Sequence, residues 1–189
     1  MKEIPEVLTL YHTGFLELRS PDVHYGRKNA DFGQGFYTTA EQDFAVRWAK
    51  EKKGSETIVN QYELNTAGLK IRQFERNAEW YFYIYSNRQR MPDLYPEDDL
   101  IIGPIANDTI FDTMGIITSG LLSEEESLKL LLIGPAYTQV VLKSQRAASQ
   151  LTFQSSRVIE PQELKQYAAL VAEEEAQFMK EFAAALGDA

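Results

Sequence analysis

Three short segments carry the residue types that could hold a ligand or take part in chemistry. The first, at residues 10–14, ends a β-prone run with His12, Thr13 and Gly14. The second, at residues 31–39, reads Asp-Phe-Gly-Gln-Gly-Phe-Tyr-Thr-Thr, and the third, at residues 137–142, carries Gln139. An imidazole and an amide can bond hydroxyl groups, and an aromatic ring can stack on a planar ligand.

Taken singly, each segment also has a purely structural interpretation. A histidine at a strand end is often a satisfied structural residue, and Gly-x-Gly before aromatic residues is typical of a bulged strand with Phe36 or Tyr37 in the core. Gln139 could be an ordinary strand residue. The glycine segment is not a dinucleotide-binding fingerprint, because it lacks the third glycine, the preceding strand and a βαβ setting.

Composition excludes several classes of chemistry. The 189 residues include no cysteine, so neither a disulfide nor a thiolate nucleophile can form. His12 and His24 are the only histidines, which leaves no multi-histidine metal site, and we expect no metal. A net charge of -9 argues against non-specific binding to nucleic acid. No apolar run reaches about 18 residues and the start lacks an apolar signal region, which predicts a cytoplasmic protein with no membrane partner.

Periodicity and capping signals predict an α+β fold of short strands with interspersed helices. Two capping boxes mark helix starts, one with Thr39 and Gln42 and one with Ser123 and Glu126. We expect a domain at residues 1–160 and a C-terminal helical appendage at residues 161–189. The expected strands are 7–11, the run after Gly35, 57–64 with a hairpin partner at 69–74, 99–105, 136–143 and 151–159. The expected helices are 39–54, 77–89, 108–114, 123–132, a short one capped by Ser144, and 163–186.

The three segments in this order resemble the ADP-ribosyltransferase superfamily. The phrase at residues 32–37 is similar to the second motif of poly-ADP-ribose polymerases, a Gly-x-Gly-aliphatic-Tyr strand that follows a loop and precedes a helix. Residues 11–14 look like the first motif, and Gln139 falls where the third strand carries glutamate or an amide. From residue 8 to about 153 the chain also looks like a bacterial family of uncharacterised domains placed in that superfamily, through residues 27–39, 103–108 and 139–142 followed by Ala147 and Leu151.

This resemblance implies a split-sheet core that binds NAD as a substrate. His12 would bond ribose hydroxyls as a neutral imidazole, Tyr37 would stack on nicotinamide, and Gln139 would reach the 2′-hydroxyl of the nicotinamide ribose. The catalytic set it implies is therefore His12, Tyr37 and Gln139. The further NAD-binding residues it implies are Tyr11, Thr13, Gly14, Arg27, Gly35 and Phe36.

Four polar residues near these motifs bear on the proposed chemistry, and two of them have alternative interpretations. Gln139 keeps the hydrogen bond of a glutamate but lacks its charge, which disfavours polymer growth and slows chemistry. Arg27 is either a solvated loop cation or a clamp on the NAD pyrophosphate. Asp31 is expected to bond backbone amides of the glycine turn, and Asp108 either caps a helix or supplies the charge that Gln139 lacks.

The function that these expectations favour is transfer of a single ADP-ribose from NAD to an acceptor, with release of nicotinamide. A protein acceptor fits the acidic chain better than nucleic acid. The resemblance suggests a bacterial toxin or conflict effector, with a neutralising partner docked on the C-terminal helix. The alternatives are an NAD- or ADP-ribose-binding module without turnover, and an NAD glycohydrolase.

Overall fold

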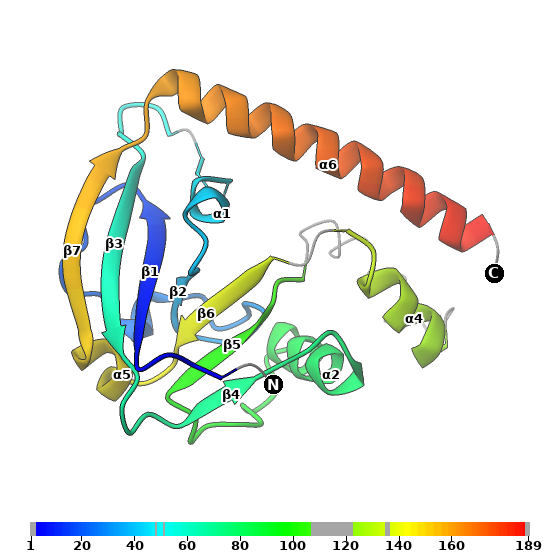
Figure 1. The fold of residues 1–189 in the computed structure, drawn as a ribbon. Coiled ribbons are helices and arrows are strands. Elements are labelled where there is room, and N and C mark those ends of the chain that lie inside the picture. Colours follow the sequence, from blue (N-terminus) through cyan, green and yellow to red (C-terminus); the bar gives the residue numbers. More distant parts are fainter. Residues whose placement is uncertain (1–2, 48, 51, 107–122, 135–136, 188–189) are drawn as a thin grey trace.

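The computed structural model describes residues 3–47, 49–50, 52–106, 123–134 and 137–187, and these form an α+β fold with two sheets (Figure 1). The expected helix at 108–114 and the residues Trp48, Asn107 and Asp108 lie outside the described residues. The strands are β1 (Val7–Gly14), β2 (Phe36–Thr38), β3 (Ile58–Asn65), β4 (Ile71–Gln73), β5 (Leu100–Pro104), β6 (Thr138–Leu142) and β7 (Leu151–Val158). The helices are the 3₁₀ turn η1 (Val23–Tyr25), α1 (Gln42–Arg47), α2 (Ala78–Arg88), α4 (Glu124–Leu131), α5 (Gln145–Ser149) and α6 (Pro161–Gly187).

The first sheet has the strand order β1-β3-β7, and both of its strand pairs are antiparallel. Alternation in β3 turns Asn60, Tyr62 and Leu64 to the interior, as the sequence pattern of that strand predicts. Buried Asn60 is satisfied by the loop after β1, since its amide bonds the Leu18 N–H and the Leu16 carbonyl. These bonds hold the start of the loop that leads to the glycine segment.

The second sheet has the order β2-β6-β5-β4, with β4 parallel to β5. We expected residues 69–74 to form a hairpin with β3, and that prediction is wrong. Both edges of β3 are taken by β1 and β7, so the following strand leaves this sheet and pairs with β5.

The two sheets meet where β1 passes β2, at one isolated backbone bridge between Tyr11 and Thr39. Its two N–H···O distances are 2.8 and 3.0 Å. Beyond this bridge the sheets diverge, and the segment of β1 from His12 onward lies at the split. The strand carrying Tyr37 is thereby placed between the strand carrying His12 and the strand carrying Gln139.

The capping predictions have mixed outcomes. Ser123 and Glu126 form the expected reciprocal box, and the Ser144 hydroxyl accepts from the Ala147 N–H. Thr39, however, does not open a helix. Its hydroxyl donates to the Thr138 carbonyl and accepts from the Glu41 N–H, so it joins β2 to β6 and α1 begins only at Gln42.

Close backbone contact fixes the loop before β2. A Cβ placed on Gly26 would lie 2.1 Å from the Gly35 carbonyl oxygen, so η1 and its C-terminal end pack directly on the glycine segment. The Gln34 side chain adds bonds to the His24 and Gly26 carbonyls. These contacts place Arg27, the next residue, beside β2.

Gly26→Ala is therefore expected to lower the free energy of unfolding by about 3 kcal/mol, because no flexible side chain can yield to the new methyl group. Gly54→Ala is the control: its Cβ would meet nothing within 4 Å, and only its φ of +79° opposes alanine. That strain is worth about 1 kcal/mol. Urea unfolding of both variants checks the difference, and equal losses would contradict the packing argument.

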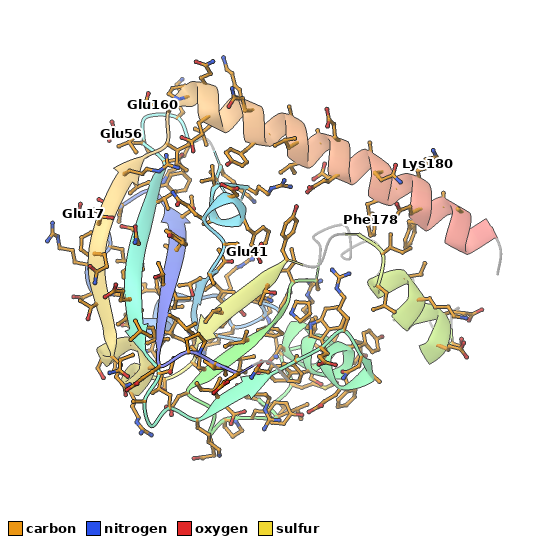
Figure 2. The ribbon with its side chains drawn as sticks, in the orientation of Figure 1. Glu17, Glu41, Glu56, Glu160, Phe178 and Lys180 are labelled. Carbon is orange, nitrogen blue, oxygen red and sulfur yellow. The ribbon has the colours of Figure 1, made fainter. Side chains whose placement is uncertain are left out.

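The long helix α6 follows β7 and extends away from the first sheet toward α4 (Figure 1). Phe178 points from α6 toward α4, whereas Lys180 lies on the opposite side of the helix (Figure 2). Phe178 and Phe182 pack with Leu130 of α4 in a small cluster. Of the described side chains at 161–184, those two phenylalanines alone are buried, while Leu164 and Tyr167 pack partly buried against the Val46 cluster.

Candidate active site

A cavity of about 930 Å³ opens at the split between the two sheets and extends under α6. Its walls include His12 of β1, Tyr37 of β2 and Gln139 of β6, so the structure brings together the three residues expected to act in chemistry. Arg27, Gly35 and Phe36 also line it. Tyr11, Thr13 and Gly14 are not among its lining residues.

Those last three residues lie just outside the cavity. Tyr11 packs with Val46 and Val59 in a separate apolar cluster and bridges to Thr39 through its backbone. The Thr13 hydroxyl donates to the Ala45 carbonyl of α1. Gly14 lies beside the Nε2 edge of the His12 ring, since a Cβ there would be 3.4 Å from Nε2.

At the split, the His12 side chain provides a hydrogen-bond donor for the Tyr37 carbonyl. Its Nδ1 lies 2.8 Å from the Tyr37 carbonyl oxygen, and its ring packs against Phe36 with 4.6 Å between centroids. Because a carbonyl only accepts, Nδ1 must carry the proton, and in the neutral ring Nε2 is an acceptor. Burial lowers the pKa of His12, partly offset by the bond to Tyr37, which favours this neutral form.

This depressed pKa predicts a pH dependence of stability. The unfolded chain takes up a proton on His12 near its ordinary pKa, while the folded chain resists protonation, so stability falls as the pH drops below about 6.5. In His12→Gln this contribution is absent. Between pH 7 and pH 5.5, urea unfolding should show a larger loss in the free energy of unfolding for the wild type than for His12→Gln. We expect the difference to be about 1 kcal/mol at most. Parallel pH profiles would contradict the assignment.

Tyr37 contributes its ring to the cavity, while its hydroxyl is used by the glycine segment. The hydroxyl accepts from the Phe32 N–H at 2.9 Å and donates to the Gly33 carbonyl at 2.8 Å. Burial, followed by the Asp31 charge, raises the pKa of Tyr37 well above its ordinary value. The phenol therefore stays neutral, which suits a stacking surface rather than a general base.

Gln139 is 3% exposed and lies next to a buried ion pair that sequence reasoning missed. Its Nε2 is 3.5 Å from Oδ2 of Asp31. We expected Asp31 to bond the amides of the glycine turn, and that is wrong. Its carboxylate instead takes the Arg88 guanidinium of α2 and the Ala106 N–H. Arg88 could not have been found from sequence, because an arginine in an aromatic-rich helix carries no signal of its partner.

The cavity wall includes both charges that are paired and charges that are not. Arg27 and Lys50 are exposed, and in the described part of the chain neither side chain makes a hydrogen bond or an ion pair. Arg27 therefore keeps both interpretations, a solvated cation or a phosphate clamp. Its position at the mouth of the cavity, fixed by the Gly26–Gly35 contact, is compatible with the second.

On the α6 side, the cavity wall contains a cluster of polar side chains. Glu174 of α6 accepts hydrogen bonds from Arg47 of α1 and from the Tyr137 hydroxyl. The Arg47 guanidinium lies 5.1 Å from the centroid of the Tyr137 ring, which stacks on Phe44 with 4.2 Å between centroids. Burial and the bond to Glu174 raise the pKa of Tyr137 to about 12.

Within the described residues, no group of three or more histidine, aspartate or glutamate side chains could hold a metal ion. Nor is any helix in the described part of the chain both long enough and apolar enough to cross a membrane.

The sequence from residue 8 to residue 153 matches a family model. The chain belongs to the DUF3990 family. That family is described as a protein of unknown function. The matched region runs from β1 into β7. It therefore contains His12, Tyr37 and Gln139 and ends before α6. No curated protein and no solved structure matches the chain.

Proposed function

We propose that this protein is an NAD-dependent mono-ADP-ribosyltransferase with an ADP-ribosyltransferase-like split-sheet core. The observation that carries the proposal is the convergence of His12, Tyr37 and Gln139 on one cavity at the split. The sequence resemblance predicts these three residues from three different strands, and the strand order β1, β2, β6 across the split supports it. The cavity has the size of small-molecule sites, which are commonly 300–1,000 Å³.

The chemistry of the two polar residues favours a sugar that carries hydroxyl groups. His12 Nε2 is an acceptor, because Nδ1 donates to Tyr37. The Gln139 amide can offer its carbonyl oxygen as a second acceptor. Two neutral acceptors suit the two hydroxyls of a ribose, and the Tyr37 ring suits a planar base such as nicotinamide.

In the proposed reaction the bond between nicotinamide nitrogen and ribose C1′ breaks, and nicotinamide leaves with the electron pair as a neutral molecule. The acceptor then forms a bond to C1′ and loses a proton, giving the ADP-ribosylated acceptor. Positive charge develops on the sugar in the transition state, so residues that hold the ribose rigidly lower the barrier. Arg27 would bind the pyrophosphate through its guanidinium. A role as a toxin or conflict effector, with a neutralising partner, belongs to this proposal as well.

Incubation of the purified protein with NAD tests the proposal. Nicotinamide release that depends on added lysate, with label transferred to protein, supports transfer. Nicotinamide release with no labelled acceptor would replace the proposal by an NAD glycohydrolase. The neutral Gln139 favours a second candidate, a module that binds NAD or ADP-ribose without turnover. That candidate predicts a raised melting temperature with NAD but no nicotinamide.

A further inference from the structure

We propose that Asp31 and Gln139 act as one carboxylate–amide pair, in which Asp31 orients the amide and holds the single negative charge that these two positions accommodate. The inference rests on the proposed function for its catalytic consequence, but not for its structural one. Asp31 would be a positioning residue that acts through Gln139.

The Asp31 carboxylate is held by several hydrogen bonds. Arg88 Nε and Nη2 lie 3.0 and 2.5 Å from Oδ1, and the Ala106 N–H lies 3.0 Å from Oδ2. The Asn87 side chain holds the Asp31 backbone carbonyl at 3.1 Å. The side chains of Arg88 and Asp31 are 7% and 14% exposed. These bonds, two of them from a nearly buried guanidinium, hold the carboxylate in one orientation.

The Asp31 carboxylate determines which way the Gln139 amide points. The contact with Oδ2, at 3.5 Å, is at the upper limit for a hydrogen bond, so its electrostatic direction matters more than its strength. An ionised carboxylate only accepts hydrogen bonds. The amide nitrogen must face Asp31, which leaves the Gln139 carbonyl oxygen as the group offered to a ligand. Gln139 thus presents an acceptor, as a glutamate would, although it carries no charge.

Repulsion between carboxylates favours an amide over a glutamate at position 139. A glutamate at residue 139 would bring a second carboxylate to roughly the distance of the present amide contact, about 3.5 Å. Two carboxylates this close do not both ionise without a large penalty, and the Nε and Nη2 donors of Arg88 already bond the first. The charge can therefore occupy position 31 or position 139, but not both.

A charge-swap cycle tests the pair with four proteins: wild type, Gln139→Glu, Asp31→Asn and Asp31→Asn/Gln139→Glu. We expect each single variant to lower the melting temperature by roughly 5 °C and nicotinamide release by at least about tenfold. The double variant, which moves the charge without changing its amount, should recover to within about threefold of wild-type release and about 2 °C of its melting temperature.

Asp93 offers a matched control, because it pairs with the nearly buried Lys143 at 3.1 Å. Asp93→Asn/Gln139→Glu should show no rescue, which excludes a general effect of removing any acid. Additive losses in the Asp31 cycle, or a Gln139→Glu single variant that is as stable and as active as wild type, would overturn the pair. If no variant releases nicotinamide but the melting temperatures still show the rescue, the pair stands and the proposed function fails.

Discussion

His12→Ala is expected to lower nicotinamide release by roughly 100-fold or more, because the ribose loses the acceptor that Nε2 provides. The variant also leaves the Tyr37 carbonyl without the donor that His12 provides at the split. The loss should appear mainly in kcat if the bond to His12 strengthens as charge develops on the sugar. Steady-state nicotinamide release, with melting temperature measured alongside, checks both parts.

The second histidine provides the control for this prediction. His24 is exposed, bonds the Asp22 carboxylate at 2.7 Å, and does not line the cavity. His24→Ala should therefore release nicotinamide within about twofold of the wild-type rate. A His12→Ala variant that folds and still turns over NAD like the His24 variant would remove His12 from the reaction.

The parts of the site that sequence predicts are those coded by contiguous residues. The glycine phrase before Phe36 and Tyr37 predicts a tight turn into a strand, and the structure has that turn and that strand. Helix ends at Ser123 and Ser144 follow from capping chemistry that acts within four residues. Placement of His12, Tyr37 and Gln139 around one cavity follows from motif order, given the resemblance.

The sequence does not predict which distant residues pair through tertiary packing. Arg88 and Asp31 are 57 positions apart, and Glu174 and Arg47 are 127 apart. Neither pair shows a periodicity or a spacing in the sequence that predicts its contact. The same holds for β4, whose partner was decided by which strand edge remained open rather than by its own residues. Thr39 shows the limit of local codes, since its hydroxyl is used between strands and not at a helix start.

The C-terminal helix is where this long-range pairing bears most on ligand binding. The side chains on the cavity face of α6 include Val171, Glu174 and Phe178, so the helix forms part of the wall. Glu174 brings a carboxylate to the one guanidinium of α1 that lines the cavity, Arg47. An anionic ligand that reaches this wall meets an arginine whose positive charge is already balanced by Glu174. The Glu174 carboxylate also repels the ligand.

Glu174→Gln is therefore expected to tighten binding of ADP-ribose by roughly tenfold to a hundredfold. A charge-assisted hydrogen bond from a freed guanidinium to phosphate contributes about 1.5–3 kcal/mol, and each 1.4 kcal/mol is tenfold in affinity. The amide is isosteric, so Tyr137 keeps a partner and the melting temperature of the free protein should change little. Isothermal titration with ADP-ribose, at several salt concentrations, measures the gain.

Glu173→Gln separates this effect from the change in net charge. Glu173 is the preceding residue of α6, is exposed, and does not line the cavity, yet its substitution removes the same charge. Its effect on affinity should stay within about twofold. The gain in Glu174→Gln should vanish in Arg47→Ala/Glu174→Gln, because the guanidinium is the group released. Equal affinities for the two single variants would mean that the phosphates bind elsewhere, with Arg27 and Lys50 as the exposed cations that remain on the described cavity wall.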